Sequence, residues 1–183
     1  GYWNLPEESA KALTNDGWFR TGDLGKFDED GFLYITGRKK RLLKTDGGKY
    51  VAPEKIEKAF ETESIVQYVV PVGDGQKFIS ALIFVNMMVA KEKVKGTPPS
   101  GEDAAAWLTR QSEVQALIKA AVASVNGRLE QWETIKKYEV LPVEAAVANG
   151  LLTPTLKIRT EEVLTRYKAN IDAIYASAKT GSK

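Results

Sequence analysis

One lysine near the end of the chain stands in a setting that suits catalysis. Lys157 follows Thr153-Pro154-Thr155 in the stretch GLLTPTLKIRT (150–160) and precedes a segment expected to be helical from about Ile158. Proline and threonine favour a turn, which limits where the stem of Lys157 starts. A fixed ammonium group can stabilise negative charge that develops during a reaction. By itself, the segment fits a plain turn with a threonine helix cap equally well.

Two further segments carry charged groups next to glycine. TGDLG (21–25) holds one carboxylate, Asp23, between two glycines, and taken alone it is typical of a surface turn. GRKKRLLK (37–44) is a basic cluster. Such a cluster fits a solvated strand edge, and it also fits a nuclear-localisation or RNA-binding patch.

Hydrophobic periodicity and turn residues predict the elements that position these groups. Helices are expected from Pro6, over 53–62, over 102–128 and from about Ile158. Asp30-Gly31 predicts a hairpin turn ahead of the alternating run 32–35. Further strands are expected at 39–45, 64–74, 77–85 and 135–142, with a flexible loop at 46–50. Strands followed by helices, then one more strand and helix, predict an α+β fold.

The composition excludes several kinds of chemistry. The 183 residues contain no cysteine and no histidine, so disulfides, a Ser-His-Asp triad and a histidine metal site cannot be built from them. Lys and Arg number 26 against 24 Asp and Glu, and a net charge of +2 argues against a general nucleic-acid binder. The most apolar stretch, 78–90, is short and broken by Ser80 and Asn86, so no transmembrane segment is predicted.

Several motifs occur in a characteristic order: GYW (1–3), DGWF (16–19), TGD (21–23), Gly31, Gly37-Arg38, Lys40 and VAPEKIE (51–57). Together they resemble the adenylate-forming superfamily of acyl-CoA synthetases, luciferases and peptide-synthetase adenylation domains. VNGRLEQWETIKKYEVLP (125–142) and NGLLTPTLKIR (149–159) are more narrowly similar to long-chain fatty-acyl-CoA synthetases. The resemblance covers nearly the whole chain.

The resemblance implies a fold and a division into domains. It implies a small C-terminal lid domain with a mixed β-sheet flanked by helices, preceded by a β-hairpin strip. Residues 1–36 would end a large N-terminal adenylation domain, and residues 37–183 would form the catalytic lid. In this family the phosphate loop and the acyl tunnel lie upstream, so the chain is expected to be a C-terminal fragment that is inactive alone. Gly37 matches the hinge position, which often carries Asp or Lys in the superfamily.

The resemblance also implies a reaction, that of an acid–thiol ligase of fatty-acid metabolism. A fatty acid and ATP give acyl-AMP, and coenzyme A then gives the thioester. Lys157 matches the catalytic lysine of adenylation, Asp23 the carboxylate that binds the ribose hydroxyls, and Arg38 an arginine near that ribose. A loop that lines the coenzyme A channel matches residues 44–50, which makes Lys44, Gly47, Gly48 and Lys49 binding candidates. No metal ligand is predicted here, since Mg²⁺ would be bound mainly by the large domain.

Two other hypotheses stay open. A basic module using GRKKR (37–41) would bind nucleic acid or a membrane surface, although its cluster lacks the aromatic residues that stack on bases. An interaction domain would use residues 1–36, whose Trp3, Trp18 and Phe19 would be exposed in the fragment and drive self-association. The leading hypothesis predicts a cytoplasmic protein, with peripheral membrane contact left open. Its partners would be fatty acid, ATP, coenzyme A and its own N-terminal domain, but no nucleic acid.

Overall fold

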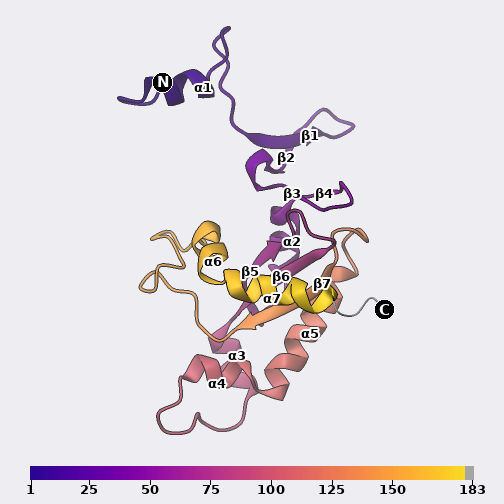
Figure 1. Cartoon of the computed structure of the whole chain (residues 1–183), viewed down its shortest axis with the longest axis vertical. Helices are drawn as coiled ribbons and strands as arrows, with labels where there is room; N and C mark the ends of the chain where they lie inside the picture. The colour runs from indigo at the N-terminus through magenta and orange to yellow at the C-terminus, as the bar shows by residue number, and fades with distance from the viewer. Residues whose placement is uncertain (180–183) are drawn as a thin grey trace. The chain divides into compact units, whose positions relative to one another are not determined.

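The computed structural model describes residues 1–179, with side chains described for residues 1–176. The chain separates into two compact units, Gly1–Leu42 and Leu43–Lys183, which are taken one at a time (Figure 1). The predicted division into 1–36 and 37–183 concerns the domains of a longer protein and stays a prediction. The last residues of the predicted C-terminal domain, 180–183, lie outside the described residues.

The first unit contains a short helix and the predicted hairpin. Helix α1 (Pro6–Ala12) starts with proline and has acidic residues in its first turn, which suits the positive end of a helix dipole. Strands β1 (Asp23–Phe27) and β2 (Leu33–Arg38) pair antiparallel. Asp28 shapes their connection, because its Oδ1 accepts hydrogen bonds from the backbone N–H groups of Asp30 and Phe32 at 3.1 and 2.8 Å.

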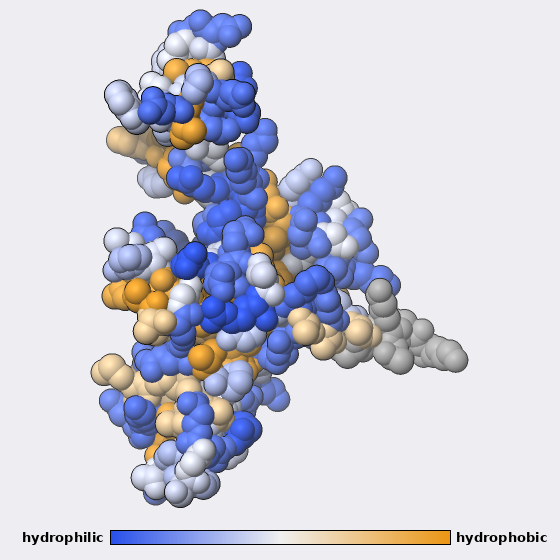
Figure 2. All heavy atoms as spheres, turned by 60° about the vertical axis from the view of Figure 1, so that its left-hand side comes forward, coloured by the Kyte–Doolittle hydropathy of each residue, from blue (hydrophilic) through white to orange (hydrophobic). Residues whose placement is uncertain are grey.

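Apolar side chains of this unit stay at its surface. Within residues 1–42, all of which the structure describes, no apolar side chain is buried, and Trp3 and Trp18 are 90% and 73% exposed. Figure 2 shows apolar side chains on the surface of this part of the chain. The unit therefore gains little stability from burial within itself.

The segment that follows differs from the predicted strand at 39–45. Residues Lys39–Arg41 form a 3-10 helix, η1, so the prediction was wrong there. Only Leu43–Lys44 (β3) is extended, and it pairs antiparallel with Tyr50–Val51 (β4). The N–H of Lys39 still donates to the carbonyl of Gly22 at 2.9 Å, which continues the β1–β2 pairing by one bond before the 3-10 helix begins.

A three-stranded mixed sheet forms the centre of the second unit. Strand β6 (Ile79–Val85) lies between β5 (Val66–Val72), which is antiparallel to it, and β7 (Ile135–Leu141), which is parallel. Every residue of β6 is buried, as expected for a central strand covered on both faces. The parallel pair requires a crossover, which consists of α3 (Met87–Lys93), α4 (Ala104–Thr109) and α5 (Ser112–Asn126).

Helices cover both faces of this sheet, as Figure 1 shows for α7. One face packs on α2 (Pro53–Phe60), α3 and α5 through a core that includes Ile56, Phe60 and Ile118. The other packs on α6 (Thr160–Arg166) and α7 (Lys168–Lys179) through Leu82, Phe84, Val163 and Ile174. The predicted α+β class, a mixed sheet flanked by helices and preceded by a hairpin, is confirmed.

Candidate functional site

The predicted turn before Lys157 is a five-residue hairpin loop. The backbone N–H of Thr153 donates to the carbonyl of Lys157 at 2.8 Å, and the N–H of Leu156 donates to the carbonyl of Thr153 at 2.9 Å. The Thr153 hydroxyl accepts a hydrogen bond from the N–H of Lys157 at 3.1 Å. Leu152 and Ile158 pair as a β-bridge just outside the loop. The start of the Lys157 side chain is therefore fixed by the main chain on both sides.

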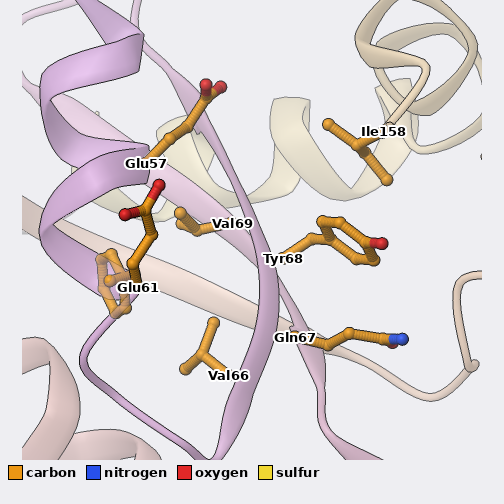
Figure 3. A pocket seen from close by; sticks show the side chains of 8 residues that line it. Glu57, Glu61, Val66, Gln67, Tyr68, Val69 and Ile158 are labelled. Atoms are coloured by element: carbon orange, nitrogen blue, oxygen red, sulfur yellow. The ribbon is translucent and has the colours of Figure 1, made fainter. Parts of the chain in front are cut away.

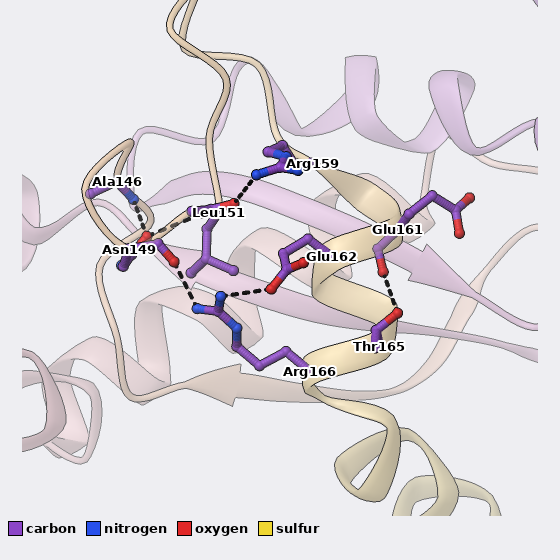
Figure 4. A network of polar contacts seen from close by, with 9 residues as sticks. Ala146, Asn149, Leu151, Arg159, Glu161, Glu162, Thr165 and Arg166 are labelled. Atoms are coloured by element: carbon purple, nitrogen blue, oxygen red, sulfur yellow. Dashed lines mark hydrogen bonds and ion pairs between the residues drawn. The ribbon is translucent and has the colours of Figure 1, made fainter.

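The base of this loop is held by the polar network drawn in Figure 4. Arg166 on α6 donates to the backbone carbonyl of Asn149 at 2.9 Å and to the Glu162 carboxylate at 2.7 Å. The Asn149 side chain accepts from the backbone N–H groups of Ala146 and Leu151 at 3.1 and 3.3 Å. Helix α6 and the segment that leads into the loop thus form one connected structure.

The Lys157 side chain is exposed. In the part of the chain that the structure describes, its ammonium group forms no hydrogen bond or ion pair. An exposed lysine that serves stability alone needs no such fixed loop. The ammonium group is a compact positive charge whose side chain starts from a fixed backbone position, and it can bind an anion.

Asp23 and Arg38, the two residues predicted beside the ribose, are brought together. They face each other across the β1–β2 ladder, and Arg38 Nε donates to Asp23 Oδ1 at 2.9 Å. The Arg38 side chain is 64% exposed and that of Asp23 is 26% exposed. A carboxylate has about four acceptor positions, so this bond leaves Asp23 able to accept from a ligand. Both residues belong to the first unit and Lys157 belongs to the second.

The predicted loop at 46–50 is a tight hairpin between β3 and β4. Thr45 N–H donates to the Lys49 carbonyl at 2.9 Å, and the Thr45 hydroxyl accepts from the Lys49 N–H at 3.2 Å. Gly48 has a φ of 78°, a left-handed value that favours glycine. Gly47 does not have a left-handed φ, and a Cβ built at this position meets no atom within 4 Å. The fold itself therefore does not explain the glycine at position 47.

Lys44 and Lys49 lie on either side of this hairpin. Lys44 Nζ stands 5.6 Å from the centre of the Tyr50 ring, and Lys49 Nζ stands 4.9 Å from the centre of the Trp132 ring. Both distances are in the range of cation–π contacts. The residue after Trp132 is Glu133, a buried carboxylate that pairs with Lys55 at the start of α2.

A basic pocket of about 360 Å³ opens beside Lys49. Cationic side chains, an aromatic ring and the backbone next to Gly47 line this pocket. The cationic groups suit the phosphates of a ligand, and the aromatic ring suits a planar group on it. Its lining includes Gly47, Lys49, Lys77, Trp132 and Lys136. Sequence reasoning missed Lys77, Trp132 and Lys136 because they come from two segments, 77–78 and 131–136, that only the folded chain brings beside the hairpin.

A second pocket, of about 390 Å³, lies between α2 and β5 (Figure 3). Glu57 and Glu61 line it from α2, and Tyr68 and Ile158 line it from β5 and the Lys157 loop. Carboxylates repel phosphate, so this pocket is unsuited to a nucleotide. It was also missed from the sequence, and it matters here because it adjoins the residue after Lys157.

The described residues contain neither a metal-binding cluster nor a membrane-spanning helix. No group of three or more Asp or Glu side chains lies together there in a way that would hold a metal ion. No helix within this part of the chain has the length and apolar character needed to cross a bilayer.

Comparison with known proteins gives one family and close relatives. Residues 40–179 match the model of the AMP-binding enzyme C-terminal domain. The chain is 38% identical over 175 residues to the long-chain-fatty-acid–CoA ligase FadD15 of Mycobacterium tuberculosis, covering 96% of the chain and 29% of that protein. It is also 38% identical over 201 residues to the long-chain-fatty-acid–CoA ligase ACSBG2 of Gallus gallus, covering 98% of the chain and 26% of that protein.

The fold is similar to that of a solved adenylation domain. The adenylation domain of a carboxylate reductase from Mycobacterium chelonae superimposes with a TM-score of 0.78 at 22% identity, over 96% of this chain and 26% of that one. At this identity the likeness concerns the fold. The chain thus spans less than a third of the length of the proteins that it matches.

Proposed function

The chain belongs to the family of AMP-binding enzyme C-terminal domains, and we propose that it is the C-terminal part of an ATP-dependent fatty-acyl-CoA ligase. The observation that carries the proposal is Lys157, an exposed lysine on a loop that hydrogen bonds fix ahead of helix α6. The similarity to two proteins named long-chain-fatty-acid–CoA ligase supports a fatty acid as the substrate. The nucleic-acid alternative built on residues 37–41 gains no support from these relatives.

In the first step, a carboxylate oxygen of the fatty acid attacks the α-phosphorus of ATP. The bond from that phosphorus to the pyrophosphate oxygen breaks, which releases pyrophosphate and leaves acyl-AMP. An anion here approaches a polyanion, so a fixed cation lowers the barrier most where negative charge gathers. We assign this role to Lys157. Because the loop fixes the backbone of this residue, its side chain loses less conformational freedom when its ammonium group binds the phosphates.

Asp23 and Arg38 are proposed to bind the nucleotide through its ribose. A carboxylate can accept hydrogen bonds from both hydroxyls of a cis-diol, as in other nucleotide sites. Arg38 donates to the Asp23 carboxylate from the neighbouring strand at 2.9 Å, which orients it. Because these groups act on binding rather than on charge development, their loss should raise the KM for ATP more than it lowers kcat.

In the second step, the thiol of coenzyme A attacks the acyl carbon and AMP leaves. We propose that the β3–β4 hairpin serves this step. Gly47 would let the thin pantetheine arm pass close to the backbone, since no Cβ stands there. The basic pocket next to it, with Lys49, Lys77 and Lys136, suits the phosphates of coenzyme A.

We further propose that the chain rearranges between the two steps. Gly37, in strand β2 close to the end of the first unit, is the proposed hinge. The exposed apolar side chains of residues 1–42 would pack on the N-terminal part of the enzyme, which also supplies the phosphate loop and the acyl tunnel. Mg²⁺, expected with ATP in this family, is proposed to be bound mainly by that part. A cytoplasmic location and contact with a membrane surface remain predictions.

The test compares the complete polypeptide that contains this chain with the chain alone. Given ATP, palmitate and coenzyme A, the complete polypeptide should release AMP and pyrophosphate and form palmitoyl-CoA. The chain alone should form no acyl-AMP, because positioning by the missing part supplies much of the rate. Pyrophosphate release by the chain alone above a no-protein control, or no palmitoyl-CoA from the complete polypeptide, would contradict the proposal.

A further inference from the structure

Three loops of this chain share one hydrogen-bond pattern. In residues 14–18, 45–49 and 153–157, the first residue is threonine, and its backbone N–H donates to the carbonyl of the fifth residue at 2.8–2.9 Å. The threonine hydroxyl accepts from the backbone N–H of the fifth residue at 2.8, 3.2 and 3.1 Å respectively. The backbone N–H of the fourth residue donates to the threonine carbonyl at 2.9–3.0 Å.

The fourth residue of this pattern adopts a left-handed backbone. Its φ is 89° at Gly17, 78° at Gly48 and 59° at Leu156. Glycine accepts such values without steric cost, whereas a side chain with a Cβ clashes with the carbonyl that follows it. The loop that carries Lys157 is therefore the one of the three that places a branched, bulky residue where the others have glycine.

Nothing in the packing of its side chain explains Leu156, which is 62% exposed. Its carbonyl, however, has a partner from another element. The hydroxyl of Tyr68 on strand β5 donates to the Leu156 carbonyl at 2.8 Å. Figure 3 shows the Tyr68 ring beside Ile158, with its hydroxyl directed away from Glu61. The tyrosine thus ties the strained position of the loop to the central sheet.

We propose that Tyr68 is a positioning residue for adenylation, which keeps the 153–157 loop in the conformation that aims Lys157. The inference rests on the proposed function, in which Lys157 acts in the first step. A hydrogen bond of ordinary net strength changes the population of the conformation that it holds by about two- to tenfold. Without it, the left-handed state of Leu156 competes with relaxed conformations in which Lys157 starts from a different place.

The test uses Tyr68→Phe in the complete polypeptide, because phenylalanine keeps the ring and removes only the hydroxyl. Adenylation, followed as pyrophosphate release, should slow by about two- to tenfold. Thioester formation from supplied acyl-AMP and coenzyme A should keep its rate. In the chain alone, hydrogen exchange at the N–H groups of Leu156 and Lys157 should become faster.

Two further variants separate positioning from general stability. Leu156→Gly in the Tyr68→Phe background should recover adenylation, since glycine removes the cost of the left-handed state. Tyr175→Phe is the matched control, because it removes a buried hydroxyl that donates to the backbone carbonyls of Val72 and Phe78 at 2.9 and 3.1 Å, away from the loop. It should lower the melting temperature without separating the two half-reactions.

Equal slowing of both half-reactions in Tyr68→Phe, or no slowing of adenylation, would overturn the inference. If Lys157→Ala abolishes adenylation while Tyr68→Phe leaves it unchanged, the proposed function stands and the role of Tyr68 is wrong. If neither variant affects adenylation, both are wrong.

Discussion

Replacing Lys157 with alanine should separate the two half-reactions of the complete enzyme. The lysine provides charge only where negative charge gathers during adenylation, and removing one preorganised group of this kind costs on the order of a hundred- to a thousandfold in rate. The hydrogen bonds of the loop use the backbone N–H and carbonyl of residue 157, so they persist in the alanine variant. The conformation of the loop should therefore survive the change.

The stability cost of the same substitution follows from the structure. The side chain is exposed, and its ammonium group has no hydrogen bond or ion pair in the described residues. A surface substitution of this kind changes the free energy of unfolding by about 0.5 kcal/mol or less. The barrier for adenylation should rise by about 2.7–4 kcal/mol, several times more. A loss of activity without a shift in melting temperature would thus reflect chemistry and not unfolding.

The assay measures pyrophosphate release from ATP and palmitate, and separately acyl-CoA formation from supplied acyl-AMP. Lys119→Ala, which removes another exposed lysine from helix α5, is the matched control and should leave both rates unchanged. Equal losses in the two half-reactions of Lys157→Ala would refute the assigned role. A large fall in the melting temperature of Lys157→Ala would show that the Lys157 side chain contributes to stability, contrary to this prediction.

Three other predictions concern the hinge, the coenzyme A hairpin and a buried phenol. Gly37 has a φ of 158°, which proline cannot adopt. Gly37→Pro should therefore abolish the half-reaction that uses this conformation and leave the other half-reaction unchanged. If both half-reactions run at their normal rates in this variant, the hinge lies elsewhere. Lys49→Ala removes the cation over Trp132 and should raise the KM for coenzyme A several-fold, with an unchanged rate of pyrophosphate release in the adenylation assay. Desolvation raises the pKa of the Tyr175 hydroxyl above its ordinary value of 10.0, so it contributes stability below pH 10 that is lost as the pH rises further. The melting temperature of the chain should fall more steeply above pH 10 than that of Tyr175→Phe, and parallel curves would contradict this.

Apart from the wrong strand at 39–45, the strands were predictable because each carries its own signal. Asp30-Gly31 marks the first hairpin, and the apolar runs of β5 and β6 need burial on both faces. Helix α3 was not predicted, since a single polar residue, Asn86, separates its apolar residues from β6. Asn86 was taken only as a break in that apolar stretch, yet its side chain caps α3 by accepting from the N–H groups of Met88 and Val89.

Helix ends were less predictable than helices. The helical pattern expected at 102–128 is two helices, α4 and α5, which are separated at Arg110–Gln111. The helix expected from about Ile158 is also divided, at Tyr167, whose ring packs edge-on against Phe84 in the core. At Tyr167 the helix breaks where this ring packs into the core, although local propensity would have continued it.

The family could be predicted from motif order, and the comparisons confirm it, but the geometry around Asp23 could not. The β1–β2 ladder contains an irregularity next to Leu24, which pairs with Gly37 while its neighbour Gly25 pairs with Ile35. If the register of the Gly25–Ile35 pair continued without this irregularity, Asp23 would face Gly37 instead of Arg38. A bulge thus re-aims the pair, and nothing in the local sequence indicates where a bulge falls.

The same reasoning explains why the Lys157 loop was only half predictable. Threonine at the first position was visible in the sequence, and its hydroxyl holds the N–H of the fifth residue in three loops of this chain. The left-handed fourth position was visible in two of them, because glycine stands there. In the third it carries Leu156, and local propensity argues against the conformation that the residue adopts. A chain tolerates such strain when its surroundings over-determine the conformation, and strained positions tend to gather at functional sites. Here the surroundings are Thr153 within the loop and Tyr68 from a strand 88 residues away in sequence from Leu156. A sequence can show the residues of such a loop, but the contact that makes the strained conformation tolerable exists only once the sheet has formed.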